Sequence, residues 1–258
     1  MDEILDLGSG TFGLLSCPQG RPRSTAVAVL NAGLIHRSGP FRLGTRLTRA
    51  LAQAGYPALR FDLPGIGDAL ADADRPAAEV LAGVLDRVQA RTGCARIVLG
   101  GICAAADASW QGALADERVA GLFLLDGLAR KGIWFRLARW QRLLRKPPGA
   151  WWAALRHQLA PADVIESEIL RDWPAPGSER GQFQQLLARD VQCLFLFTGG
   201  ATYFLHPRQL RATYGRGVRN PAVAFEHWPE CDHTYYDTRQ RQRLIELVGD
   251  WLGRRFPQ

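Results

Sequence analysis

Cys103 stands in a sequence context that suits a nucleophile. It lies in the run Gly101-Ile-Cys-Ala-Ala105, which follows an apolar segment and leads directly into a helical pattern. This spacing matches the nucleophile elbow G-x-S-x-G, with Cys in place of Ser and Ala in place of the last Gly. An elbow needs small neighbours, and the start of the next helix lowers a thiol pKa. We therefore predict a nucleophile; the alternative is a small buried residue in a tight turn.

A cysteine nucleophile requires a base, and His233 has the best placement among the five histidines. It stands between the last predicted strand and the last predicted helix. Enzymes with such an elbow carry nucleophile, acid and histidine in that chain order. His36 follows the first clear strand and is expected to line the site, whereas His227 lies within a predicted strand and is expected to be structural.

The acid that would orient this histidine is harder to find. Its usual place is the loop after the strand 191–197, and that loop, residues 198–203, contains no carboxylate. Asp126 ends the preceding strand and would emerge at the same edge of the sheet, so we favour it. Glu230 and Asp232 are local alternatives, and a Cys–His dyad without an acid is another.

An oxyanion hole needs two convergent backbone N–H groups. Ala104, directly after the nucleophile, is expected to supply one, and Gly33 or Leu34, in the loop after the first clear strand, the other. The sequence has no cluster with metal-ligand spacing and no phosphate-cradling glycine loop. We therefore predict no metal and no nucleotide cofactor.

Strands and helices that alternate along the chain would position these residues. Such alternation is typical of a mostly parallel sheet with helices on both faces. The expected strands span residues 25–31, 57–62, 96–100, 119–125, 191–197 and 222–227, and the expected helices span 41–54, 76–92, 103–114 and 240–251.

Residues 127–190 interrupt this alternation. The interval holds five tryptophans and two proline breaks, and it shows no good strand. We predict a helical cap inserted into a single domain of residues 1–258, with Trp134 binding substrate. The first part of the interval is strongly basic and free of acidic residues. This charge would attract phosphates, an acidic protein or a membrane surface, and a solvated helix face is an equally good interpretation.

The composition agrees with a globular enzyme. The chain has 258 residues, 47% of them hydrophobic, and a formal net charge of +7. No apolar run approaches the roughly 20 residues of a membrane-spanning helix. The acidic N-terminus does not resemble a signal peptide, so we expect a cytoplasmic protein. Five scattered cysteines fit neither a disulfide framework nor a zinc site.

Taken together, these segments resemble the α/β-hydrolase superfamily. The resemblance rests on the run 30–40, the run 56–68 with its Arg60-Phe-Asp-x-x-Gly-x-Gly-Asp68 pattern, the cysteine elbow and Asp232-His233. More narrowly, they are similar to the serine-aminopeptidase-like or dienelactone-hydrolase-like hydrolases encoded with bacterial exosortase systems. That group carries Cys at the elbow, which implies Cys103 as nucleophile and His233 as base.

The chain departs from this resemblance at two positions. The residue after the elbow cysteine, polar in many relatives, is Ala104, and the usual acid loop has lost its Asp, with Ala201 near the expected place. The resemblance implies an α/β-hydrolase fold, and the second departure leaves the choice between hydrolysis and another reaction open.

The leading hypothesis is acyl transfer from an ester or thioester through an S-acyl-Cys103 intermediate, either to water or to another acceptor. The basic, Trp-rich interval suits an acyl or aromatic substrate on an anionic carrier such as coenzyme A or a carrier protein. The alternative is a non-catalytic binding protein of the same fold for an acyl or aromatic ligand. Nucleic-acid binding has little support, because the tryptophans lie at helical intervals typical of a core or lid.

Overall fold

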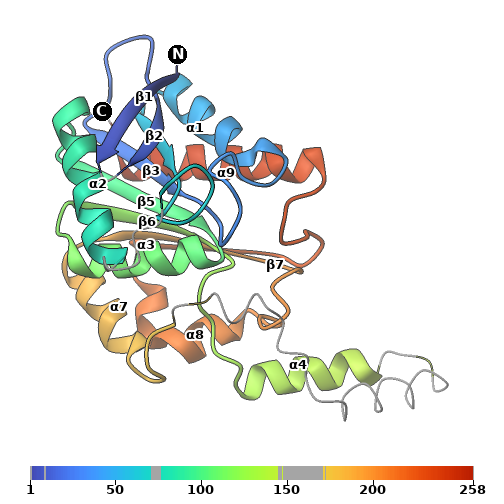
Figure 1. Ribbon diagram of the computed structural model, residues 1–258. Coiled ribbons are helices and arrows are strands. Elements are labelled where there is room, and N and C mark those ends of the chain that lie inside the picture. Colours follow the sequence, from blue (N-terminus) through green and yellow to red (C-terminus); the bar gives the residue numbers. More distant parts are fainter. Residues whose placement is uncertain are drawn as a thin grey trace.

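Six apolar strands lie side by side in parallel at the centre of the molecule (Figure 1). The structure, a computed structural model, describes residues 2–8, 10–70, 77–144, 147, 171 and 173–257. The sheet order is β1-β2-β4-β3-β5-β6-β7-β8. The strands are β1 (Asp2–Gly8), β2 (Thr11–Ser16), β3 (Thr25–Leu30), β4 (Ala58–Phe61), β5 (Arg96–Ile102), β6 (Val119–Leu125), β7 (Gln192–Thr198) and β8 (Val223–Trp228). The predicted mostly parallel sheet is confirmed.

The N-terminal hairpin was not expected from the sequence. β1 and β2 pair antiparallel, and β2 adds antiparallel to β4. β1 is an edge strand with mostly half-exposed side chains, so it lacks the apolar run that marks a buried strand. The buried Arg60 of β4 ties the hairpin down, because its guanidinium donates to the Asp2 carboxylate at 2.8 Å and to the Thr48 hydroxyl at 2.9 Å.

Helices cover both faces of the sheet, as predicted. The helices are η1 (Pro40–Arg42), α1 (Leu43–Gln53), α2 (Ala77–Thr92), α3 (Ala104–Ala115), α4 (Ile133–Leu144), α7 (Glu179–Ala188), α8 (Arg208–Tyr214), η2 (Gly215–Arg219) and α9 (Thr238–Arg255). Leucines and valines of α1 and α9 pack on one face, together with Trp251. Side chains of α2, α3, α7 and α8 pack on the other, including Trp110 and Phe183.

The carboxyl ends of the parallel strands meet at one edge of the sheet. β5 pairs with both β3 and β6, and β6 pairs with β7, all in parallel. Cys103 follows β5 directly, Asp126 follows β6, and the loop with His233 follows β8. Residues far apart in sequence are therefore delivered to the same edge, where ligand sites of open α/β sheets lie.

The interval 127–190 is described only in part. Its described residues include α4, which extends away from the body of the molecule in Figure 1, and α7, which packs on the sheet. Residues 145–146, 148–170 and 172 lie outside the described part, so the predicted cap stays a prediction. Among the described residues, no helix is long and apolar enough to cross a membrane.

Candidate active site

Cys103 occupies the sharp turn that a nucleophile elbow requires. Its backbone has φ 60° and ψ −119°, a conformation that non-glycine residues rarely adopt. Gly101 makes the turn possible, because a Cβ there would lie 2.4 Å from the Ala105 Cβ and 3.0 Å from the Leu30 carbonyl oxygen. Ala105 is itself fully buried. The pattern Gly-x-Cys-x-Ala is thus a packing requirement, since both flanking positions leave room only for small residues.

The Cys103 thiol differs electrostatically from the other cysteines. Burial raises its pKa, but the hydrogen bond with His233, the charge of Arg171 and the Ala104 backbone N–H together bring it below its usual value. In contrast, burial raises the pKa of Cys193 and of Cys231 to about 12. Because only the thiolate is strongly nucleophilic, Cys103 is the reactive thiol among these three.

His233 links this thiol to a buried carboxylate. Its Nδ1 lies 2.7 Å from Oδ2 of Asp126, which is fully buried. Asp126 also accepts hydrogen bonds from the Thr198 backbone N–H at 2.6 Å and the Thr198 hydroxyl at 2.7 Å. Burial lowers the pKa of His233, but the hydrogen bonds with Asp126 and Cys103 raise it to about 10. Both shifts favour the thiolate–imidazolium form of the Cys103–His233 pair.

The local packing leaves no room for an acid at either glycine of the loop after β7. A Cβ on Gly199 would lie 2.1 Å from the Pro229 carbonyl oxygen, and one on Gly200 would lie 2.3 Å from the His233 backbone nitrogen. The loop that carries His233 therefore packs directly against Gly199 and Gly200. A carboxylate side chain has no room at Gly200, and Asp126 approaches His233 from the neighbouring strand instead.

Gly200→Ala is expected to displace His233 and weaken the thiolate. Overpacking of this kind costs about 1–3 kcal/mol of the free energy of unfolding. The loss of the imidazolium partner should raise the Cys103 pKa by about one unit, which means roughly tenfold slower alkylation by iodoacetamide near neutral pH. Chemical denaturation and the alkylation rate measure the two effects.

Gly249→Ala is the matched control for this substitution. Gly249 lies within α9, and a Cβ there meets nothing within 4 Å. The control should keep the wild-type alkylation rate and gain a few tenths of a kcal/mol to about 1 kcal/mol in stability. Equal alkylation rates in Gly200→Ala and Gly249→Ala would contradict the proposal that packing against Gly200 positions His233.

Two backbone segments are the candidates for the oxyanion hole, the start of α3 and the loop after β3. The Ala104 backbone N–H lowers the Cys103 pKa, so it lies beside the sulfur. The loop after β3 is held by Asn31, whose side chain donates to the Gly33 carbonyl at 2.7 Å and accepts from the Leu63 N–H at 2.8 Å. Gly33 has φ 53°, and the Leu34 side chain is exposed. Their role in an oxyanion hole stays a prediction.

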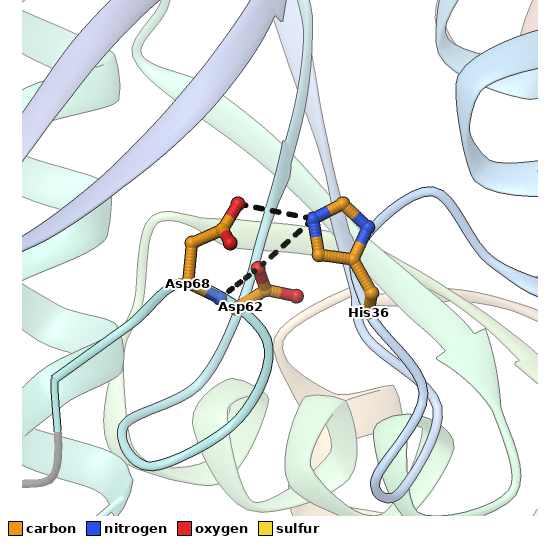
Figure 2. A group of neighbouring side chains, drawn as sticks. All are labelled: His36, Asp62 and Asp68. Atoms are coloured by element: carbon orange, nitrogen blue, oxygen red, sulfur yellow. Dashed lines mark hydrogen bonds and ion pairs between the residues drawn. The ribbon is translucent and has the colours of Figure 1, made fainter.

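The residues after β4 brace that same loop (Figure 2). The buried carboxylate of Asp62 accepts from the Arg37 backbone N–H and from its guanidinium, each at 2.5 Å. Asp68 lies 2.7 Å from the other Arg37 nitrogen and 3.2 Å from Nε2 of His36. Gly67 is required here, because a Cβ would lie 2.4 Å from Asp62 Oδ2. The Asp-x-x-Gly-x-Gly-Asp pattern thus positions the candidate oxyanion loop.

His36, Asp62 and Asp68 could also offer ligands to a metal ion. One ligand atom from each lies within 4.8 Å of the others. Both carboxylates, however, already pair with Arg37, whose side chain is almost fully buried. A cation would compete with this fixed positive charge, so the donor set serves an internal ion-pair network better than a metal.

The remaining predicted residues occupy different surroundings. Trp134 stacks on His206, with ring centroids 5.3 Å apart, so it packs near the start of α8. Its substrate-binding role stays a prediction. Glu230 pairs with Arg243 on the surface at 2.8 Å, and Asp232 caps the turn before α9 by accepting from backbone N–H groups. Among the three carboxylates considered from the sequence, Asp126 is the one bonded to His233.

Sequence reasoning missed two charged residues beside the nucleophile. Arg171 Nη1 lies 3.3 Å from the Cys103 sulfur, and the same guanidinium pairs with Asp107 on α3. Asp107 stands four residues after Cys103, one helical turn on, which is a weak sequence signal for proximity to the site. Arg171 offers no such signal, because it lies in the interval 127–190, where the alternation of strands and helices is lost.

No family model matches the chain. The N,N-dimethyltransferase OxyT of Streptomyces rimosus is 31% identical over 100 residues, which cover 34% of this chain. The match spans 28% of the length of that protein, and nothing in the structure explains it.

Solved structures resemble the chain along nearly its whole length. A dienelactone hydrolase from Anabaena variabilis has a TM-score of 0.59 at 13% identity, covering 98% of this chain and 96% of that one. A thermophilic esterase from Thermogutta terrifontis has a TM-score of 0.58 at 19% identity, covering 99% of both chains. A lidless α/β serine hydrolase from Xanthomonas campestris has a TM-score of 0.58 at 16% identity, covering 100% of this chain and 95% of that one. The chain therefore has the α/β-hydrolase fold.

Proposed function

We propose that the protein is a hydrolase or acyltransferase that works through an S-acyl-Cys103 intermediate. The observation that carries this proposal is the alignment of Cys103, His233 and Asp126 at the carboxyl edge of the sheet, with the thiol on a strained elbow. The α/β-hydrolase fold, shared with esterases, supports the class of reaction.

Each residue has a defined task in this reaction. The Cys103 thiolate attacks the acyl carbon, and the leaving group takes its proton from the His233 imidazolium. His233 then removes a proton from the acceptor, which attacks the S-acyl carbon and releases the thiolate. Asp126 fixes the tautomer and orientation of His233 and stabilises its charge. The N–H of Ala104, with one from Gly33 or Leu34, would hold the oxyanion.

Cysteine at the elbow favours thioester or activated-ester donors. Thiolate attack on such a donor exchanges leaving groups of similar basicity, so acylation is easy, whereas transfer to water depends on the base. The basic residues of the described part of α4, Arg136, Arg139 and Arg142, would suit an anionic carrier such as coenzyme A or a carrier protein. All five cysteines are free thiols, which fits our proposal of a reducing, cytoplasmic environment.

A panel of acyl-coenzyme A thioesters and p-nitrophenyl esters of increasing chain length tests the proposal. We expect saturable release of the thiol or phenol with at least one donor. Adding an alcohol, amine or thiol acceptor separates the two reactions, because a transferase will form the new ester, amide or thioester product faster than free acid. Ligand-induced thermal stabilisation without turnover of any donor would favour the binding-protein alternative instead.

A further inference from the structure

Arg171 brings a buried positive charge into contact with the nucleophile. Its Nη1 lies 3.3 Å from the Cys103 sulfur and 3.2 Å from the Tyr203 hydroxyl. The Arg171 side chain is only 4% exposed. A guanidinium in such surroundings stays charged, and the low local dielectric strengthens its attraction for a thiolate.

A second, independent set of contacts fixes this guanidinium in place. Asp107 on α3 pairs with it through two nitrogens, with the Nη2–Oδ1 distance at 3.0 Å. Asp107 is as deeply buried as Arg171. The guanidinium carbon also lies 5.1 Å from the centre of the Trp173 ring. Because α3 starts at the elbow, the Asp107 carboxylate positions the guanidinium beside the Cys103 sulfur.

Two cation–carboxylate pairs lie beside the Cys103 thiol. The His233–Asp126 pair approaches from the β8 and β6 ends, and the Arg171–Asp107 pair approaches from the interval 127–190 and α3. Tyr203 faces the same space and is neutral, because burial raises its pKa well above the usual range. Arg171 is therefore the one permanent positive charge that the described residues place against the sulfur.

We propose that Arg171 is a catalytic residue that holds the negative charge of the Cys103 sulfur, both in the free enzyme and when the sulfur leaves the acyl group. This inference rests on the proposed function. In acylation the Sγ–C bond forms and the bond to the leaving group breaks. In deacylation the acceptor gives its proton to His233, its bond to the acyl carbon forms, and the Sγ–C electron pair returns to the sulfur, where the Arg171 N–H donates.

This role differs from that of the oxyanion hole, which binds the carbonyl oxygen. A guanidinium beside the sulfur makes the thiolate a better leaving group, because charge that develops on Sγ is met by a donor already in place. The Arg171 guanidinium thereby favours breakage of the Sγ–C bond of the S-acyl intermediate. Catalysis then depends on Arg171, which lies in the interval 127–190, in addition to any substrate contacts that the interval makes.

The pH dependence of Cys103 alkylation tests this role without any substrate. The rate of iodoacetamide modification, assigned to Cys103 by peptide mass, reports its thiolate fraction. Arg171→Met should raise the midpoint of the profile by about one pH unit, which is roughly tenfold slower modification below the midpoint. Asp107→Asn removes the counter-charge of Arg171 and should lower the midpoint.

Arg130→Met is the matched control. Arg130 also pairs with a buried carboxylate, Glu179, and its guanidinium carbon lies 5.4 Å from the same Trp173 ring, but it makes no contact with Cys103 among the described residues. The control should lose similar stability and keep the wild-type midpoint.

An unchanged midpoint in a folded Arg171→Met variant would overturn the proposal and leave Arg171 a structural residue. If Arg171→Met does not fold, Asp107→Asn decides alone: a lower midpoint supports the proposal, and an unchanged or higher one overturns it. With an active acyl donor, Arg171→Met should also lower kcat more than it changes KM and accumulate S-acyl enzyme. Because alkylation needs no donor, failure to find a substrate leaves this test intact.

Discussion

Cys103→Ala is expected to abolish turnover of every acyl donor that the wild type uses, with a loss of at least about 10³-fold in kcat. The sulfur is the atom that forms the covalent intermediate in the proposed mechanism, and the alanine side chain has no group that His233 can activate in its place. Steady-state kinetics with the best donor measure the effect. The variant should fold normally, because alanine fits a site flanked by Gly101 and Ala105.

Cys103→Ser is the informative companion. It places an oxygen nucleophile at the elbow, as in serine hydrolases of this fold, and His233 with Asp126 provides a base for it. We expect low but measurable ester hydrolysis, because a serine hydroxyl is a weaker nucleophile than the Cys103 thiol with its lowered pKa. Wild-type activity in Cys103→Ala would place the reaction elsewhere in the molecule and contradict the proposed mechanism.

Asp126→Asn is expected to lower kcat on the order of 10²-fold and to slow deacylation more than acylation. The carboxylate raises the pKa of His233 to about 10 together with Cys103, and without it the imidazole is a weaker base for the acceptor. The thiolate retains Arg171 as a partner, so acylation suffers less. Pre-steady-state measurement of leaving-group release should therefore show a clear burst followed by slow turnover.

Asp232→Asn is the control for this change. Asp232 stands next to His233 in sequence, but its carboxylate accepts from the Thr234 and Tyr236 backbone N–H groups. Because it takes no part in the His233 hydrogen bond, its loss should change kcat by less than a few-fold. Equal losses in Asp126→Asn and Asp232→Asn would remove Asp126 from the mechanism.

The pH dependence of folding follows from the same pair. The His233 pKa is raised above its unfolded value, so its contribution to stability is fully present below about pH 6.5 and is lost as the pH rises through about 10. The wild type should therefore lose the stabilising His233–Asp126 interaction at alkaline pH. In that pH range it should lose more stability than Asp126→Asn does.

The strand–helix alternation and the elbow could be predicted from the sequence because both depend on local patterns. Apolar runs mark the buried parallel strands, and the small residues Gly101 and Ala105 mark the turn between β5 and α3. The position of Asp126 could be predicted for a topological reason, since carboxyl ends of neighbouring parallel strands share one edge. The hydrogen bonds between Asp126 and Thr198 could not be predicted in this way.

Contacts between residues far apart in the sequence could not be predicted from local sequence patterns. Arg171 stands 68 residues after Cys103, and no periodicity relates the two. The Asp62–Arg37 pair belongs to a motif that could be identified, but its task of holding the loop after β3 appears only when the two loops are seen together. The β1–β2 hairpin was missed because an edge strand with half-exposed side chains carries no strong apolar signal.

Intact-protein mass spectrometry of the acyl-enzyme tests the central claim most directly. The wild type, Cys103→Ala and Asp126→Asn would be mixed with the same acyl thioester, quenched in acid within seconds and weighed, and the modified peptide would be sequenced. We predict an adduct of one acyl mass on Cys103, longer-lived in Asp126→Asn and absent from Cys103→Ala. An equal adduct in Cys103→Ala, or rapid turnover of the donor with no adduct in Asp126→Asn, would contradict catalysis through S-acyl-Cys103.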